Sequence, residues 1–459
     1  MNKVIIFFLA FLTLFSCRNR NPNLSEKQLL ALTKIAELEN MPVDEEYVVL
    51  PGVKYKESRA IDPAQPPVVI DIKKALHQGA EDIPLSSIGK SVRYIKTIIP
   101  KDMYVQDFVV RDDTLLVSCR NPGATQQCIM PYTLDGKFLN IIWEVTPKGI
   151  TKKYHPDIEE EAMPDTSPQN TKTNTPPSPP SWRQPSLDKG DEIIFNVYFD
   201  HTGKNIHYTI TRFADREHPE YRKHIISTLN GTQKAVSSER FSEQNRYTYY
   251  LPSGSWAHVY KTLDQWFNKS PWSLVTFSSQ RDTLCRFANY NPVTPVHVSA
   301  GNTIEKITAY FYNNRLTFRT DYADTIFRLA APDRIIPVYA INCGKYKLLA
   351  TEGLRNQIEN KVYIENIRET QRFLFISINT PAREIQVLVF DKQQKTLRLH
   401  RNEKFSNDID HGLAFYPEKI MPDGKTMACY HYMSNNPSDV MNRLFPSMAK
   451  NNVVFMIVQ

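Results

Sequence analysis

Short runs in which apolar and polar residues alternate fill most of the chain from about residue 68 onward. Examples are residues 92–95, 115–117, 193–199 and 373–378, and Pro, Asn, Asp or Gly bounds such runs. Short runs rich in β-branched and aromatic residues predict β-strands. Because no long helical pattern separates them, the sequence predicts an all-β fold: a sandwich, a barrel or a propeller.

One helical pattern precedes the strands. Within residues 25–39, leucine, isoleucine and alanine recur at helical spacing, and Ser25 and Gln28 form a capping box. We therefore expect a short helix there, inside a segment, residues 17–66, that precedes the strand pattern and would act as a tether.

An internal repeat narrows the fold. The sequence DTLCRF at residues 282–287 returns as DTIFRL at residues 324–329, and Pro-Val pairs follow the copies at Pro295 and Pro337, again 42 residues apart. One four-stranded blade of a β-propeller has about this length. The roughly 340 strand-patterned residues would hold six to eight such blades.

Three segments resemble a known group of proteins. They are IPLSSIGKSVRYI at residues 83–95, the DTIFRL segment, and NDIDHG at residues 407–412. They are similar to uncharacterised lipoproteins of Bacteroides and its relatives, which are assigned as six-bladed β-propellers. The resemblance extends in patches from about residue 83 to the C-terminus. It implies a six-bladed propeller over residues 67–459, and it brings no established activity.

Residues 154–187 interrupt the strand pattern. They are acidic at first and then rich in Pro, Ser and Thr, with TPPSPP at residues 175–180. Such a composition buries too little apolar surface to fold. Since strand patterns of the same kind stand on both sides, we predict a disordered insertion within the propeller domain.

Residues 1–16 have the pattern of a secretory signal peptide. Lys3 is followed by an apolar run over residues 4–12, and the sequence LFSC ends at Cys17. This ending resembles the bacterial lipobox, whose cysteine carries a diacylglycerol and an acyl chain such as palmitate. The apolar run is shorter than the ~20 residues that a spanning helix needs, which disfavours an uncleaved membrane anchor. We expect cleavage before Cys17 and lipid attachment to it.

The lipid would place the protein in the cell envelope, at the outer membrane. Arg18 and Arg20 follow Cys17 and would lie near anionic headgroups, and residues 18–21 contain no acid. Surface-displayed lipoproteins of the group that this chain resembles tend to carry acids there. The sequence therefore favours a periplasm-facing orientation.

Composition limits the partners. The chain has 459 residues and a formal net charge of +7, and its basic residues are dispersed. A small, dispersed excess on an exported protein predicts no nucleic-acid partner.

The cysteines after Cys17 leave two interpretations open. There are five, at Cys119, Cys128, Cys285, Cys343 and Cys429. An odd number cannot all pair, although Cys119 and Cys128 are close enough in sequence for a hairpin disulfide. Strand-like surroundings favour the alternative, buried free thiols.

Linear motifs predict no catalytic residue, no metal site and no cofactor. The sequence contains no H-E-x-x-H, C-x-x-C, G-x-S-x-G or G-x-G-x-x-G pattern. Aromatic residues such as Trp256, Trp266 and Trp272 would stack on sugar rings, but packing between blades is the commoner role of such residues.

The densest polar cluster is NDIDHG, and it supplies the candidate site. Asp408 and Asp410 alternate beside His411, so they would bind a divalent cation or a sugar hydroxyl. The alternative is that Asp and Asn side chains cap a tight connection between blades by bonding to the backbone.

The tether, the fold and the missing motifs favour one function over another. We expect a membrane-anchored, non-enzymatic binding or assembly lipoprotein whose ligand is a glycan or another envelope protein. The competing hypothesis is a polysaccharide lyase or glycosidase with its site at the mouth of the propeller channel.

Overall fold

The computed structural model describes residues 56–58, 66–100, 103–121, 126–154, 192–212, 221–239, 246–262, 270–289, 307–354, 358–432, 439–445 and 452–459. The predicted signal peptide, Cys17, the helix expected at residues 25–39 and all but the first residue of the insertion expected at residues 154–187 lie outside them.

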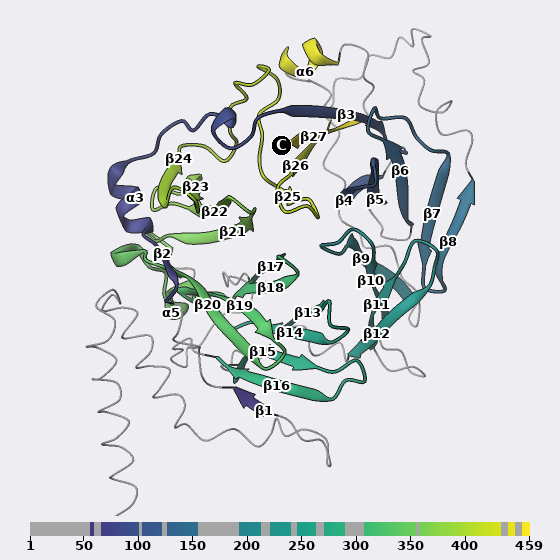
Figure 1. Ribbon diagram of the computed structural model, residues 1–459, viewed down its shortest axis with the longest axis horizontal. Helices are drawn as coiled ribbons and strands as arrows, with labels where there is room; N and C mark the ends of the chain where they lie inside the picture. Colours follow the sequence, from purple (N-terminus) through teal and green to yellow (C-terminus); the bar gives the residue numbers. More distant parts are fainter. Residues whose placement is uncertain are drawn as a thin grey trace, which may run out of the picture. The chain divides into compact units, whose positions relative to one another are not determined.

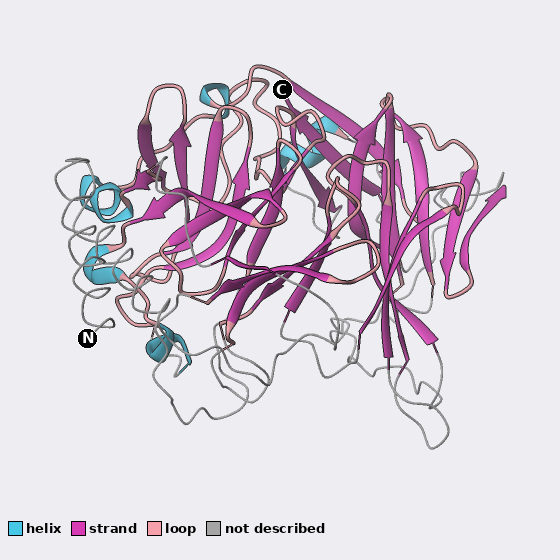
Figure 2. Cartoon of the chain, turned by 60° about the horizontal axis from the view of Figure 1, so that its bottom comes forward, coloured by secondary structure: helices cyan, strands magenta, loops and turns pink. Residues whose placement is uncertain are grey.

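The described strands form six sheets (Figure 1). Each sheet contains four antiparallel strands, and three of the sheets add a fifth strand. Figure 2 shows that strands, drawn in magenta, far outweigh the few short helices. Six meanders of this size are the blades of a six-bladed β-propeller, which confirms the fold class that the sequence predicts.

Unit 1 of the chain comprises Met1–Gln78, Asn245–Glu365 and Ile378–Glu384, and its described residues hold two blades. Blade 3 contains β13 (Arg246–Tyr250), β14 (Trp256–Tyr260), β15 (Trp272–Phe277), β16 (Thr283–Ala288) and β1 (Lys56–Ser58). Blade 4 contains β17 (Thr308–Tyr312), β18 (Arg315–Arg319), β19 (Thr325–Ala331), β20 (Arg334–Ile341) and β2 (Val68–Ile70). The helical elements of unit 1 are α3 (Ile72–Gln78), η4 (Gly344–Tyr346) and α5 (Ala350–Leu354).

Unit 2 comprises Gly79–Gln244, Asn366–Ser377 and Ile385–Gln459, and it holds three blades and most of a fourth. Blade 1 contains β4 (Tyr104–Arg111), β5 (Thr114–Arg120), β6 (Gln127–Thr133), β7 (Ile141–Thr146) and β8 (Gly149–Tyr154). Blade 2 contains β9 (Glu192–Phe199), β10 (Ile206–Arg212), β11 (Tyr221–Ser227) and β12 (Gln233–Glu239). Blade 5 contains β21 (Tyr363–Glu369), β22 (Phe373–Asn379), β23 (Ile385–Asp391) and β24 (Thr396–His400). Blade 6 contains β25 (Lys419–Ile420), β26 (Met427–Tyr432), β27 (Asn452–Val458) and β3 (Val92–Ile98), and η2 (Leu85–Ser87) and α6 (Asp439–Leu444) are the helical elements of the unit.

Blade 6 joins the two ends of unit 2. Strand β3 pairs antiparallel with β27, in a register that runs from Val92 opposite Val458 to Ile98 opposite Asn452. Every residue of β27 is buried, because both of its faces pack against apolar side chains. One buried cluster contains Ile95 of β3, Phe108 of β4 and Phe455 of β27, so blades 1 and 6 share a core.

Short stretches that precede blade 1 cover the outer edges of other blades. Strand β1 pairs parallel with β16, and β2 pairs parallel with β20. Farther along, Glu81 forms a parallel bridge with His400 at the end of β24. These pairings occupy edge backbone groups that would otherwise be open to another chain. Strand β1 falls inside the segment that the sequence assigns to the tether.

The two ends of a blade differ. Strand direction alternates in a meander, so the connections after the first and third strands share one end, the short-turn end. At this end Asp112-Asp113 and Asn313-Asn314 make two-residue turns in which every φ is positive, between +47° and +59°. The opposite end, the long-connection end, carries residues 342–362 after β20 and residues 401–418 after β24.

The structure changes the meaning of the internal repeat. DTLCRF forms most of β16, the fourth strand of blade 3, whereas DTIFRL forms β19, the third strand of blade 4. The 42-residue offset therefore relates strands at different positions in their blades, and it is not the blade period that the sequence suggested.

The five cysteines that follow Cys17 are buried thiols. Cys119 and Cys128 stand opposite each other on β5 and β6. Burial raises the pKa of Cys119 well above its usual value and raises the pKa of Cys128 to about 12. Among the described residues, no helix is long and apolar enough to cross a membrane.

Candidate functional site

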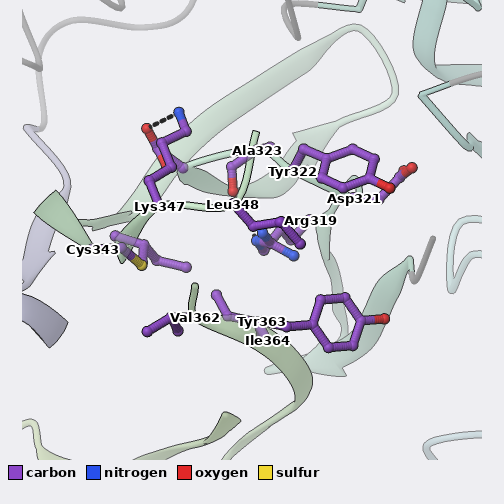
Figure 3. Close-up of a pocket in the computed structure, with 12 residues that line it drawn as sticks. Arg319, Asp321, Tyr322, Ala323, Cys343, Lys347, Leu348, Val362, Tyr363 and Ile364 are labelled. Carbon is purple, nitrogen blue, oxygen red and sulfur yellow. Dashed lines mark hydrogen bonds and ion pairs between the residues drawn. The ribbon is translucent and has the colours of Figure 1, made fainter. Parts of the chain in front are cut away.

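A pocket lies at the long-connection end of blade 4, within unit 1 (Figure 3). Its walls come from residues 320–324, which connect β18 to β19, from residues 342–362, which leave β20, and from the start of β21. Both connections reach the same end of the blade because they follow its second and fourth strands. Alternating strand direction thus places these polar segments side by side.

Arg319, the last residue of β18, is the cation of the pocket. The residue is only 8% exposed, and its Nε donates a hydrogen bond to the Ala323 carbonyl oxygen at 2.8 Å. Its two terminal amino groups donate to no acceptor among the residues that the structure describes. Figure 3 shows this side chain among the lining residues, with Tyr322 drawn above it and Tyr363 below.

Burial also affects the charge of Arg319. Loss of solvent lowers the pKa of Arg319, while the neighbouring Cys343, Asp324, Asp321 and Tyr363 act in the opposite direction. A guanidinium stays protonated in proteins even when its pKa falls from its usual range. The pocket therefore contains a permanent buried positive charge.

Asp321 ties the pocket to blade 3. Its carboxylate Oδ1 accepts a hydrogen bond from the Thr262 backbone N–H at 3.0 Å, and Thr262 Oγ1 donates to the Asp321 carbonyl oxygen at 2.9 Å. Asp321 is 2% exposed, and burial raises the pKa of its carboxyl group. Asn289 Nδ2 in turn donates to the Thr262 carbonyl oxygen at 3.2 Å. The residue 320–324 turn is therefore anchored from outside its own blade.

Tyr322 holds this turn in an unusual conformation. Its φ is +64°, which a bulky side chain rarely adopts. Its ring packs on α5, where a Cβ added to Gly353 would lie 2.3 Å from Tyr322 Cε1. Only a glycine allows this approach, so the strain at Tyr322 and the glycine at position 353 belong to one arrangement.

Ion pairs fix the opposite wall. Lys347 Nζ lies 2.5 Å from Asp324 Oδ2, as the dashed line in Figure 3 marks. Lys361 Nζ donates to the Lys347 carbonyl oxygen at 3.1 Å and pairs with Glu352 at 2.6 Å. A parallel bridge between Lys347 and Val362 joins the two ends of the connection. These contacts hold Lys347, Glu352, Lys361 and Val362 to one another.

The size of the pocket limits what enters it. Its volume is about 20 Å³, which is room for one water molecule or for the end of a small functional group. Pockets that enclose whole organic ligands are on the order of 300–1,000 Å³. The pocket can therefore receive one functional group of a larger partner. The Arg319 guanidinium would donate hydrogen bonds to that group.

The candidate residues Asp408 and Asp410 lie elsewhere, in the residue 401–418 connection of unit 2. Asp408 Oδ1 accepts from the Ser86 N–H at 2.8 Å, and Asp408 Oδ2 accepts from Ser86 Oγ at 2.5 Å. Hydrogen bonding to Ser86 lowers the pKa of Asp408.

Asp410 and Asn407 make a local turn. Asp410 Oδ1 accepts from Asn407 Nδ2 at 2.6 Å, from the Gly412 N–H at 2.9 Å and from Tyr94 Oη at 3.2 Å. Such bonds are those expected of side chains that cap a connection. The described residues contain no group of three or more His, Cys, Asp or Glu side chains placed to hold a metal ion. A ligand at Asp408 and Asp410 stays a prediction.

Unit 2 contains a second polar cluster, which the sequence did not predict. Lys419 Nζ of β25 lies 2.5 Å from Asp107 Oδ1 of β4, and Asp107 Oδ2 accepts from the Phe199 N–H at 2.7 Å. Glu418 precedes Lys419, and Arg368 Nε donates to its carbonyl oxygen at 2.7 Å. Four charged side chains from three blades thus gather at the first strands of those blades.

The tryptophans expected either to stack on sugars or to pack are buried. Trp256 is 1% exposed and Trp272 is 6% exposed, and the Arg286 guanidinium lies 5.3 Å from the ring centre of Trp272. They have packing roles, and Trp266 lies outside the described residues.

Known structures resemble this chain only distantly. A member of the DUF4221 family from Bacteroides vulgatus is 9% identical with a TM-score of 0.39, and the match covers 81% of this chain and 99% of that one. A Thermus thermophilus protein described as a glucose dehydrogenase is 9% identical with a TM-score of 0.32, covering 80% and 100% of the two chains. A Pyrococcus horikoshii acylaminoacyl peptidase is 9% identical with a TM-score of 0.34, covering 76% and 54%. Similarity this low carries no inference about function.

Family membership is clearer. No curated protein matches this sequence. The family model that matches is a domain of unknown function, DUF4933, over residues 50–434. This match confirms that the family is uncharacterised, while the resemblance to Bacteroides lipoproteins and the lipid attachment stay predictions. The chain belongs to the DUF4933 family.

Proposed function

We propose that this protein is a lipid-anchored, non-enzymatic binding or assembly protein of the bacterial cell envelope. In this proposal Cys17 carries the lipid, the outer membrane holds the protein, and the propeller faces the periplasm. The partner contacts the long-connection end of blade 4, where the pocket opens.

One observation carries the binding role: hydrogen bonds and ion pairs hold both walls of the pocket in place without any partner. The Thr262–Asp321 hydrogen bonds fix one wall, and the Lys347–Asp324 and Lys361–Glu352 ion pairs fix the other. A preformed surface loses little conformational entropy on association, which is how binding loops on a stiff scaffold gain affinity. The strained Tyr322 is consistent with such a role, since strain concentrates at functional sites.

Site-specific photocrosslinking in cells tests the proposal. A photoreactive amino acid replaces Lys345 or Leu349, which are exposed residues of the 342–362 connection, or Asn313, an exposed residue at the short-turn end of the same blade. We expect adducts of one defined mass from positions 345 and 349 and none from position 313. Equal labelling at both ends, or no adduct at all, would contradict the proposal.

A second candidate function, a glycosidase or polysaccharide lyase, is favoured by the cluster of Asp107, Arg368, Glu418 and Lys419. Burial raises the pKa of Glu418, and the charge of Asp107 raises it further, whereas the Tyr430 N–H, Arg368 and Lys419 lower it. A carboxyl group of raised pKa near a second carboxyl group is the arrangement that glycosidases use.

Activity assays separate the two candidates. The full-length protein is incubated with neutral and acidic polysaccharides, and reducing ends or unsaturated products are measured. The enzyme candidate requires turnover that Glu418→Gln and Asp107→Asn both abolish and that Glu403→Gln, at an exposed position, leaves unchanged. The binding proposal expects no turnover by any of these proteins.

A further inference from the structure

We propose that the blade 4 pocket binds one carboxylate, presented by an aspartate or glutamate side chain of a partner polypeptide. This inference rests on the proposed binding function and names the chemistry of its partner. The group that receives the carboxylate is the Arg319 guanidinium.

The donors of Arg319 provide the first argument. Nε is already committed to the Ala323 carbonyl oxygen, and this bond orients the plane of the guanidinium. The terminal amino groups remain, and they make no hydrogen bond to a residue that the structure describes. Two N–H groups in a fixed fork match the two oxygens of a carboxylate, which is the geometry that makes Arg–carboxylate pairs strong and selective.

The surrounding charges provide the second argument. Asp324, one of the two carboxylates beside Arg319, already pairs with Lys347 at 2.5 Å. Asp321 accepts from the Thr262 N–H and so directs Oδ1 toward blade 3. A buried cation whose own donors are unused gains more from an incoming anion than an exposed cation does, because water screens it less.

The size of the pocket selects the source of the carboxylate. About 20 Å³ admits the end of an acid carried on a slender methylene stem. In an acidic sugar the carboxylate is bonded directly to a wide ring, which would stop at the rim. At the neighbouring surface, exposed Lys345 and the 46% exposed Leu349 would contact a polypeptide with acidic and apolar side chains.

Titration with defined peptides tests this assignment. The full-length protein in detergent micelles is titrated with a labelled, end-blocked peptide of six Gly-Glu repeats and, separately, with six Gly-Gln repeats. We expect the Glu peptide to bind at least about tenfold more tightly. Arg319→Gln should remove that difference, whereas Arg315→Gln, which removes the same charge from the exposed start of β18, should keep it.

Two further measurements keep the result decisive. Arg319→Lys retains the charge but loses the fork, so it should bind with intermediate affinity. If the Arg319 variants do not fold, competition on the unchanged protein decides: sodium acetate should displace the Glu peptide, whereas acetamide in sodium chloride of the same ionic strength should not.

Each failure has a distinct meaning. Equal binding of the two peptides, or binding unaffected by Arg319→Gln, overturns the carboxylate assignment. A preference for oligogalacturonate that depends on Arg319 overturns the polypeptide source. If the crosslinked adducts at positions 345 and 349 persist in Arg319→Gln, the proposed binding function stands without the carboxylate. If no adducts form in any variant, that function itself fails.

Discussion

Thr262 and Asp321 join blades 3 and 4 through two hydrogen bonds that run in the same direction. The Thr262 N–H donates to Asp321 Oδ1 at 3.0 Å, and Thr262 Oγ1 donates to the Asp321 carbonyl oxygen at 2.9 Å. Both residues are almost completely buried, so a lost partner would leave a polar group without solvent. This link positions the turn that carries the pocket.

Removing the Asp321 carboxylate should therefore weaken the fold. We expect Asp321→Ala to lower the free energy of unfolding by about 1–3 kcal/mol, because the Thr262 N–H is left without its acceptor. Urea unfolding followed by tryptophan fluorescence measures the change. Asp113→Asn, at an exposed turn position that suits asparagine, is the control and should have no effect. A loss below about 0.5 kcal/mol for Asp321→Ala would contradict the role of this link.

The contact between Gly353 and Tyr322 makes a second prediction. Alanine at position 353 would place a methyl group 2.3 Å from the Tyr322 ring, so Gly353→Ala should cost about 1–3 kcal/mol despite the better helix propensity of alanine. In a Tyr322→Ala background the clash is absent, and the same change should be neutral or stabilising. A double-mutant cycle measures this coupling. Additive effects would show that the ring and the glycine do not constrain each other.

The strand pattern made the fold predictable, although the internal repeat was misleading about the blade period. Alternation of apolar and polar residues survives in β3 and β21, where buried positions recur at every second or third residue. The repeated DTLCRF and DTIFRL segments suggested the correct architecture, yet they form strands at different positions in their blades. Similar strands recur in a propeller because all blades bury similar surfaces, so likeness between two strands does not fix their position.

The pocket was not predictable in the same way. The RTDYAD segment at residues 319–324 looks like an ordinary polar turn, and Lys347 follows it only after two more strands. Alternating strand direction brings them to one end of the blade, and no local pattern encodes that proximity. Asp408 and Asp410 stood out because they are neighbours in sequence, and local proximity is also what makes a side chain suitable as a cap.

A buried histidine, His207, makes stability depend on pH. His207 Nδ1 lies 3.2 Å from His224 Nε2, beside Tyr198. Burial lowers the pKa of His207 well below its usual value, and His224 and His201 lower it further. Below about pH 6.5, His207 is protonated in the unfolded chain but stays neutral in the folded chain until the pH is much lower. The free energy of unfolding therefore falls as the pH falls.

The expected slope from His207 is about 1.4 kcal/mol per pH unit. Unfolding in urea between pH 7 and pH 5 measures it. His207→Phe should flatten the slope, whereas His77→Gln, at an exposed position of α3, should leave it unchanged. An identical slope in His207→Phe and in the unchanged protein would show that other groups control the acid response.

Lipid attachment is tested in living cells. Labelled palmitate should enter the full-length protein, and the protein should fractionate with the outer membrane. Cys17→Ala should abolish both the label and the membrane association, whereas Cys119→Ala, which alters a buried thiol, should retain them. Label that persists in Cys17→Ala would place the lipid at another residue.

The Asp410 turn makes a separate prediction. Asp410→Ala removes the acceptor of the Asn407, Gly412 and Tyr94 hydrogen bonds, so it should lower the free energy of unfolding by about 1 kcal/mol. Glu403→Ala, at an exposed position nearby in sequence, should be neutral. Thermal unfolding with and without calcium checks the cation hypothesis. Stabilisation by calcium that Asp408→Ala and Asp410→Ala remove would establish a site there.

A crystal structure of the protein with the Gly-Glu peptide tests the central claim most directly. The claim predicts one glutamate carboxylate in the blade 4 pocket, with both oxygens about 2.7–2.9 Å from the terminal nitrogens of Arg319. Arg319 should keep its hydrogen bond to Ala323. A peptide bound elsewhere, with only water beside the Arg319 guanidinium, would contradict the claim.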